Sequence, residues 1–145
     1  MVVKGSNTIE LNDVLVGDVW VASGQSNMEF PMTALVNSGK EIAAAQFPKI
    51  RVFRVAHRPS DYPRSDVEAK AWALCMPENV GDSSAVAYYF ARDLYQKLNV
   101  PVGLMESFWG GTPAESWTSL PTLAGDASLM PVFAERSKEI GRAHV

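Results

Sequence analysis

The fold is determined by the stretch Asp18-Val-Trp-Val-Ala-Ser-Gly-Gln-Ser-Asn-Met28. Its first part, residues 18–23, is a short apolar run with β-branched side chains, which predicts a strand buried on both faces of a parallel sheet. Gly24 ends this run and allows the chain to turn sharply. Ligands of open α/β sheets bind at the carboxyl ends of the strands. The sequence therefore predicts that Ser26 lies on a turn at the ligand-binding edge of a sheet.

Further elements on the carboxyl side of this stretch complete an α/β pattern, in which strands and helices alternate. A helix is predicted over residues 83–98, where apolar residues recur every three or four positions. Buried strands are predicted at residues 50–55 and 102–105, and a short helix at residues 38–45. We therefore expect an α/β fold with a mainly parallel sheet.

The remaining segments carry weaker signals. Residues 7–16 alternate apolar and polar side chains, which is typical of a half-buried antiparallel strand. Residues 56–70 contain two prolines and few apolar side chains, so they are predicted to form a long surface loop of the kind that often serves a site. A last helix is predicted at residues 133–140, and residues 141–145 show no recognisable pattern.

Composition excludes several classes of protein. The 145 residues, 47% of them hydrophobic and 20% charged, suit one globular domain. A net charge of -3 without a basic stripe argues against nucleic-acid binding. The longest apolar run, Ala85 to Ala91, is far shorter than the roughly twenty residues of a membrane helix. The lone Cys75 excludes an internal disulfide, and no residues have metal-ligand spacing, so we expect neither a metal nor an organic cofactor.

A second glycine-rich turn, Gly110-Gly111-Thr112, follows the strand predicted at residues 102–105. Consecutive glycines bring backbone N–H groups close to a ligand, as an oxyanion hole requires. Both turns also have a simpler interpretation, because Gly, Ser and Asn are ordinary turn residues. The first turn matches the G-x-S-x-G elbow of α/β-hydrolases only in part, since Met28 replaces the second glycine. The spacing of the residues leaves these alternatives open.

Two longer segments closely resemble the sialate O-acetylesterase family of carbohydrate esterases, which are SGNH (GDSL-like) hydrolases. They read DVLVGDVWVASGQSNMEF at residues 13–30 and NVPVGLMESFWGGTPAESW at residues 99–117. The resemblance covers most of residues 7–120. It implies a flavodoxin-like three-layer α/β/α fold, of which this chain holds the front half. Residues 1–17 would end a preceding β-domain, and residues 18–145 would form the N-terminal part of the esterase domain.

The same resemblance implies an activity. Ser26 would attack the acetyl carbonyl of an O-acetylated sugar, such as sialic acid or a related carbohydrate. The oxyanion would accept hydrogen bonds from the backbone N–H of Ser26 and from that of Gly110 or Gly111. Further candidate pocket residues flank these positions, although packing within the loops is the favoured role for most of them: Gln25, Asn27, Glu29, Thr112, Glu115 and Trp117. The expected partner is a small-molecule or oligosaccharide acetyl ester.

Two parts of the family's pattern are missing from the chain. One is a Gln-Gly-Glu motif, and the other is an Asp-x-x-His pair that supplies the general base. His57 and His144 are the only histidines, and neither follows an aspartate by three residues. A serine hydroxyl needs a base to become a good nucleophile. We expect His57 to be a solvated loop residue that nothing orients and His144 to lie in a frayed tail, so the chain alone should be nearly inactive.

These gaps suggest a fragment of a longer protein, and the final Gly-Arg-Ala-His-Val fits a truncated or frameshifted reading frame. Such a half-sheet would expose an unpaired edge and apolar surface. The first residues lack the long apolar stretch of a signal peptide, so we expect none in these 145 residues, and secretion or periplasmic export is expected only of the longer protein. The alternatives to an esterase are a non-catalytic carbohydrate-binding or interaction module that keeps the crevice, and a serine hydrolase of the α/β-hydrolase type, which the partial elbow disfavours.

Overall fold

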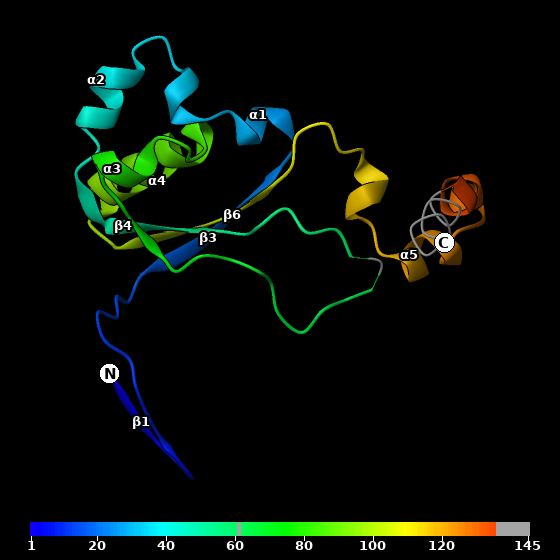
Figure 1. Cartoon of the computed structure of the whole chain (residues 1–145), viewed down its shortest axis with the longest axis horizontal. Helices are drawn as coiled ribbons and strands as arrows, with labels where there is room; N and C mark the ends of the chain where they lie inside the picture. Colours follow the sequence, from blue (N-terminus) through cyan, green and yellow to red (C-terminus); the bar gives the residue numbers. More distant parts are fainter. Residues whose placement is uncertain (61, 136–145) are drawn as a thin grey trace.

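The computed structural model describes residues 1–60 and 62–135, which form a hairpin, a four-stranded sheet, one long helix and several short helices (Figure 1). The strands are β1 (Val2–Lys4), β2 (Thr8–Glu10), β3 (Asp18–Gly24), β4 (Phe47–Arg54), β5 (Ala73–Cys75) and β6 (Val102–Phe108). The α-helices are α1 (Ser26–Glu29), α2 (Ser38–Ala43), α3 (Pro77–Val80), α4 (Ala85–Leu98) and α5 (Leu120–Gly125). Three 3-10 helices complete the set: η1 (Met32–Ala34), η2 (Ala114–Trp117) and η3 (Ala127–Leu129).

The sheet has the strand order β3-β6-β4-β5. Strand β6 is parallel to both β3 and β4, whereas β5 is antiparallel to β4. The register pairs Val19 with Gly103 and Gly24 with Phe108, so β3 and β6 end side by side. The predicted mainly parallel sheet is therefore confirmed, and the turns that follow β3 and β6 leave the sheet at the same edge. The short strand β5 carries no pattern that the sequence analysis detected.

Helix α4 packs on this sheet because its apolar side chains repeat at the helical period. Ala87, Tyr88 and Ala91 are buried against the core. The helix begins one residue after Ser84, whose side chain accepts a hydrogen bond from the Ala87 N–H and caps the first turn. It ends at Leu98, and the next residue, Asn99, adopts the left-handed conformation that asparagine tolerates. The predicted helix over residues 83–98 is thus confirmed, with its start shifted by two residues.

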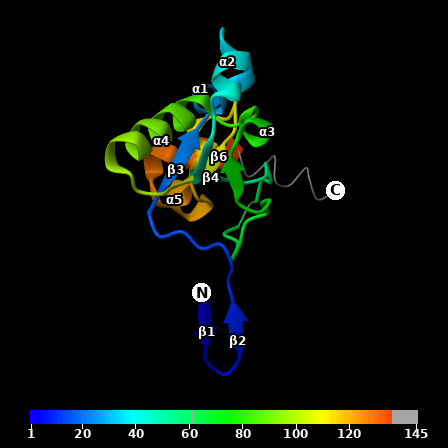
Figure 2. The ribbon, with the colours of Figure 1, turned by 90° about the vertical axis from the view of Figure 1, so that its left-hand side faces the viewer.

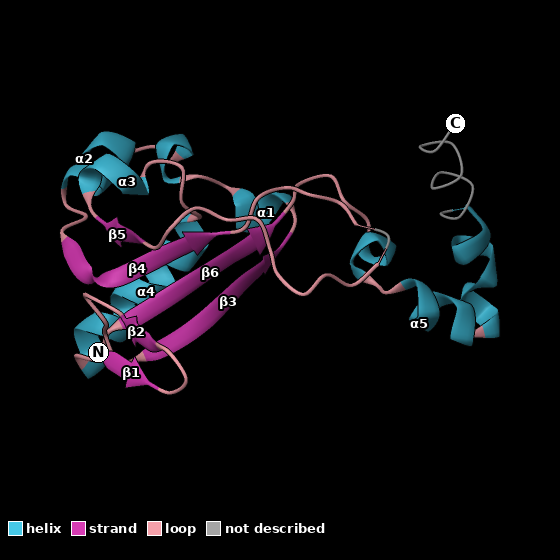
Figure 3. Ribbon diagram, turned by 60° about the horizontal axis from the view of Figure 1, so that its bottom comes forward, coloured by secondary structure: helices cyan, strands magenta, loops and turns pink. Residues whose placement is uncertain are grey.

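The helices α2, α3 and α4 all lie on one face of the sheet (Figures 1 and 3). On β3, Trp20 faces α4 and makes an edge-to-face contact with Phe90. Because side chains alternate along a strand, Val19 and Val21 point to the opposite face, where they remain 60% and 66% exposed. No helix among the described residues covers that face. The α/β class is confirmed, but the expectation that β3 is buried on both faces is wrong, because the described helices cover only one face of the sheet.

The hairpin of β1 and β2 projects away from the sheet (Figure 2). The antiparallel strand expected at residues 7–16 is confirmed only for Thr8–Glu10, and the rest of that segment runs to β3 without strand pairing. The proposed division of the chain at residue 17 stays a prediction. Of the helix expected at residues 133–140, residues 136–140 lie outside the described part of the chain. None of the described helices is long and apolar enough to cross a membrane.

Candidate active site

Ser26 lies on the tight turn between β3 and α1. Gly24, the last residue of β3, has φ +143°, a backbone conformation that side chains disfavour. Gln25 precedes the helix, and Ser26 is its first residue. Ser26 is exposed at the carboxyl end of the strand, as the sequence predicts. Its role as a nucleophile stays a prediction, since position alone does not demonstrate reactivity.

The glycine turn after β6 approaches Ser26 closely. The Trp109 N–H donates a hydrogen bond to the Gly24 carbonyl at 3.0 Å, which joins the two turns. A Cβ atom at Gly110 would lie 3.5 Å from Cα and 3.6 Å from Cβ of Ser26. Gly111 has φ +78° and open space around it. The two motifs that the sequence analysis selected are therefore adjacent at one edge of the sheet.

Glu29 connects these two turns directly. One of its carboxylate oxygens, Oε2, accepts a hydrogen bond from the Gly110 N–H. A Cβ atom at position 110 would lie only 2.7 Å from the same oxygen, so a larger residue would displace Glu29 or the turn. This contact agrees with the loop-packing role favoured for Glu29. It also engages the only hydrogen that the Gly110 amide can donate.

His57 is held beside the same residues, so the expectation that nothing orients it is wrong. Its Nε2 lies 2.8 Å from the Phe108 carbonyl oxygen. Since a carbonyl only accepts, Nε2 is the donor, and Nδ1 is the acceptor in the neutral ring. The imidazole stacks on Trp109 with ring centroids 4.4 Å apart, and Nε2 lies 3.7 Å from Oε1 of Glu29.

The position of His57 in the sequence was sufficient to place it near the candidate site. His57 follows closely after β4, which is parallel to β6, so it leaves the sheet at the same edge as the glycine turn. The rule that places sites at the carboxyl ends of parallel strands applies to β4 as it does to β3. Trp109, the stacking partner of His57, was recognised only as part of a motif. The other histidine, His144, lies outside the described residues.

Thr112 forms hydrogen bonds at the end of the glycine turn. Its hydroxyl donates a hydrogen bond to the Trp109 carbonyl at 2.6 Å and accepts one from Nε1 of Trp117 at 2.8 Å. Trp117 ends η2, which also contains the half-buried Glu115. The remaining candidates, Gln25 and Asn27, are exposed on either side of Ser26.

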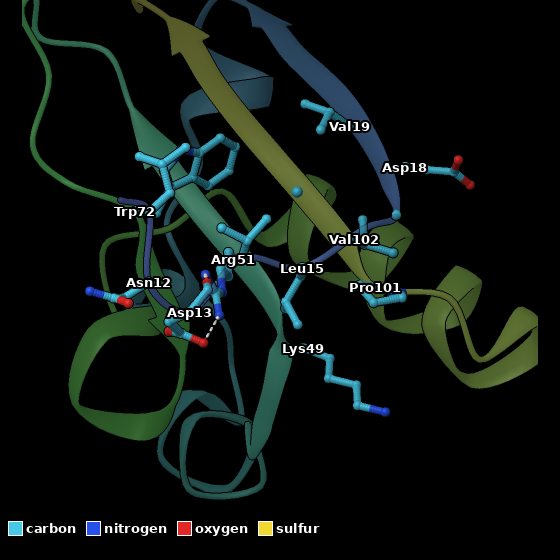
Figure 4. A pocket seen from close by; sticks show the side chains of 14 residues that line it. Asn12, Asp13, Leu15, Asp18, Val19, Lys49, Arg51, Trp72, Pro101 and Val102 are labelled. Carbon is cyan, nitrogen blue, oxygen red and sulfur yellow. Dashed lines mark hydrogen bonds and ion pairs between the residues drawn. The ribbon is translucent and has the colours of Figure 1, made fainter. Parts of the chain in front are cut away.

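A cavity of about 420 Å³ lies at the opposite edge of the sheet (Figure 4). It is lined by the first residues of β3 and β6, including Asp18 and Val102, and by the ion pair between Asp13 and Arg51. Ser26 follows the other end of β3. This cavity is therefore separate from the candidate site.

A different cavity, of about 510 Å³, adjoins the candidate site. Glu29, His57 and Phe108 form part of its wall, together with Arg54 and Lys70. Its volume falls in the range of small-molecule sites, roughly 300–1,000 Å³. The site therefore has adjacent space for a ligand larger than an acetyl group.

The described part of the chain also contains other side chains that are common in reactive sites, among them one free cysteine. None of its His, Cys, Asp and Glu side chains form a group of three that could hold a metal. Cys75 is buried on β5, and burial together with the charge of Glu106 raises the pKa of its thiol to about 12. A thiol with this pKa stays protonated at neutral pH and is a poor nucleophile.

The fold and the serine-bearing edge of the sheet define a class of protein. The chain resembles the crystal structure of a carbohydrate acetylesterase from Xanthomonas citri with a TM-score of 0.76 and 35% sequence identity, over 86% of this chain and 28% of that one. Its fold is thus the mixed α/β fold of an SGNH-like carbohydrate acetylesterase.

Comparison with individual sequences gives a narrower relationship. The chain is 38% identical to the sialate O-acetylesterases of Rattus norvegicus and Homo sapiens over 120 residues, and to that of Mus musculus over 124 residues. These alignments cover 77%, 77% and 80% of the chain. The chain is therefore homologous to the sialate O-acetylesterases, as the motifs suggested. It spans only 22–23% of the length of these relatives. No protein-family model matches it.

Proposed function

We propose that this chain carries the nucleophile of an enzyme that removes O-acetyl groups from carbohydrates. The observation that supports this most directly is the exposed Ser26 at the carboxyl end of β3, with the backbone of Gly110 packed against it. The relatives supply the substrate class, since their names specify sialate and carbohydrate acetyl esters. Sialic acid or a related O-acetylated sugar is the proposed substrate.

The proposed reaction has two steps. The Ser26 Oγ adds to the acetyl carbonyl carbon while a base takes the hydroxyl proton, and the resulting tetrahedral intermediate loses the sugar oxygen, which receives a proton. Water then attacks the acetyl-serine, releasing acetate and regenerating Ser26. In both steps the negative oxygen is stabilised by backbone N–H groups about 2.7–3.1 Å away. Ser26 itself and the turn after β6 would provide these groups.

We propose that the general base lies outside this chain. No imidazole or carboxylate among the described residues forms a hydrogen bond with the Ser26 hydroxyl, and the Nε2 of His57 is directed at the Phe108 carbonyl. In a serine protease, loss of the base costs about 10⁶ in turnover. Binding and the oxyanion hole alone still give about 10³ over water. We therefore propose that the 145-residue chain hydrolyses acetyl esters only slowly.

A chromogenic acetyl ester and an O-acetylated sugar test this proposal on the purified chain. Slow hydrolysis that Ser26→Ala abolishes is the expected result. Equal rates for the chain and Ser26→Ala would exclude Ser26 as the nucleophile. Fast turnover that disappears in His57→Ala would make His57 the base and overturn the proposed inactivity. A longer form that includes Gln-Gly-Glu and Asp-x-x-His motifs should be fully active, and only while Ser26 is present.

The alternative is a module that binds carbohydrate without hydrolysing it. The cavity beside Glu29 and His57, combined with the unassisted serine, is the observation that favours it. Calorimetric titration with the deacetylated sugar separates the two functions. Binding without any Ser26-dependent hydrolysis, in the chain and in the longer form, would support the binding module.

A further inference from the structure

Glu29 links the helix bearing Ser26 to the turn after β6. Ser26 and Glu29 are the first and last residues of the single-turn helix α1. The Glu29 carboxylate reaches across to β6 and accepts the Gly110 N–H. A movement of the glycine turn would therefore pull on the helix that carries the proposed nucleophile.

The two oxygens of Glu29 have different surroundings. Oε2 accepts the amide, and a hydrogen bond to a carboxylate is roughly twice as strong as one between neutral groups. Oε1 lies 3.7 Å from His57 Nε2, and the imidazole is stacked on Trp109, the residue before Gly110. The side chain of Glu29 is 36% exposed, so the carboxylate is only partly hydrated. These contacts restrain the carboxylate from both sides.

Gly110 and Gly111 differ in what their backbones can do. The Gly110 N–H has one hydrogen, and Glu29 accepts it. The Gly111 N–H has no acceptor in the described part of the chain, and the space around Gly111 is open. An oxyanion at Ser26 would have to compete with a carboxylate for the Gly110 amide but would find the Gly111 amide free.

We propose that Glu29 is a positioning residue that holds the glycine turn against Ser26, and that Gly111 rather than Gly110 donates to the oxyanion. This inference rests on the proposed esterase function. Glu29 does not touch the reacting atoms. It fixes the distance between Ser26 and the glycine turn. Because its carboxylate engages the Gly110 amide, the oxyanion accepts a hydrogen bond from the Gly111 amide instead.

Amide hydrogen exchange by NMR tests the contact without requiring any catalysis. The Gly110 amide should exchange slowly in the wild type, and Glu29→Ala should accelerate it by about tenfold or more, the loss expected for one hydrogen bond to a charged group. Glu29→Gln keeps an acceptor oxygen and should preserve most of the protection. Glu78→Ala changes an exposed carboxylate on α3 and serves as the matched control.

Labelling with an alkyl fluorophosphonate tests the consequence for Ser26. The Ser26 Oγ forms a bond to phosphorus, and fluoride leaves with the hydroxyl proton taken up by solvent. Glu29→Ala should lower the maximal labelling rate by about 10- to 100-fold, as expected when a reacting group is displaced by about 1 Å. Glu29→Gln should stay within about threefold of the wild type, because the acceptor is retained. In the labelled protein the phosphonyl oxygen should slow exchange at Gly111.

Each outcome decides a different point. Wild-type exchange and labelling in Glu29→Ala would overturn the positioning role. New protection at Gly110 instead of Gly111 in the labelled protein would overturn the donor assignment. A wild-type chain that matches Ser26→Ala in labelling would contradict the proposed esterase function, while the exchange measurement would still test the contact between Glu29 and Gly110. Circular dichroism must show that every variant is folded.

Discussion

Two glutamates accept backbone N–H groups in this molecule, but in contrasting surroundings. Glu106 on β6 is 1% exposed and accepts hydrogen bonds from the Ser84 N–H at 2.8 Å and from Arg54 at 2.7 and 2.9 Å. Glu29 is partly exposed at the edge of the sheet, and among the described residues its carboxylate accepts one hydrogen bond, from the Gly110 N–H. The first carboxylate joins β6, β4 and the start of α4 within the core. The second joins two turns around the candidate site.

The two glutamates are expected to differ in how much they contribute to the stability of the fold. A buried carboxylate without its partners has no access to water, so its hydrogen bonds are required for folding. A partly exposed carboxylate can exchange its partner for water at low cost, so its contact contributes little to stability. Glu106 therefore belongs to the framework that places the strands, and Glu29 to the adjustment of the site.

The largest expected effect comes from Glu106→Gln. This change removes the charge that Arg54 pairs with and leaves a buried amide with a mismatched donor, which should cost about 3 kcal/mol of unfolding free energy. Glu29→Gln should cost less than about 0.5 kcal/mol. Urea denaturation followed by circular dichroism measures both. Equal costs for the two substitutions would remove the distinction between the glutamates.

A second test uses Cys75, whose thiol pKa is raised from 9.0 to about 12 by burial and by the charge of Glu106. Because the folded protein holds this proton more tightly than the unfolded chain, stability is full below pH 9 and falls as the pH rises toward 12. Between pH 8 and 10 the wild type should lose about 1.4 kcal/mol more than Cys75→Ala. Parallel pH profiles for the two proteins would exclude a raised pKa.

Ser84→Ala tests whether the carboxylate of Glu106 or the neighbouring hydroxyl of Ser84 organises this region. The Ser84 backbone N–H would still bind Glu106, but the Ser84 hydroxyl would no longer accept the Ala87 N–H at 3.2 Å. Loss of this helix cap should cost about 1 kcal/mol. Thermal or urea unfolding provides the measurement. A cost as large as that of Glu106→Gln would mean that the hydroxyl, and not the carboxylate, organises this region.

The smallest effect is expected at Asp13, which pairs with Arg51 through its carboxylate at 2.7 Å. The Asp13 side chain is 77% exposed, so solvent screens the interaction. Asp13→Asn should change the unfolding free energy by no more than about 0.5 kcal/mol. The same urea experiment applies, repeated at high salt. A loss above about 1 kcal/mol that high salt does not reduce would show that exposure is a poor guide to the cost of removing these carboxylates.

Much of the framework was accessible from the sequence. The helical repeat of apolar residues determined α4, and two short apolar runs, one ending at Gly24 and one following Pro101, marked β3 and β6. These signals are local, since they depend on the spacing of side chains within one element. The position of Ser26 followed from them through the general rule for ligand sites in parallel sheets.

The sequence was less informative about which faces are covered. The apolar run at Val19 and Val21 predicts burial on both sides, yet these side chains are exposed because the described helices lie on the other face of the sheet (Figure 3). Strand order depends on pairing between distant segments, which no local pattern encodes. The short strand β5 was missed for the same reason, because its pairing with β4 gives it its conformation.

The strands β3, β4 and β6, the helix α4 and the turn that carries Ser26 could be identified from the sequence alone. Each of them depends on residues that are close together in the chain. Tertiary packing was needed to bring Glu29 to Gly110 and His57 to Phe108, across sequence separations of 81 and 51 residues. The register of β3, β6 and β4 places their carboxyl ends at one edge, and hydrogen bonds that act over about 3 Å can form only after that register is set.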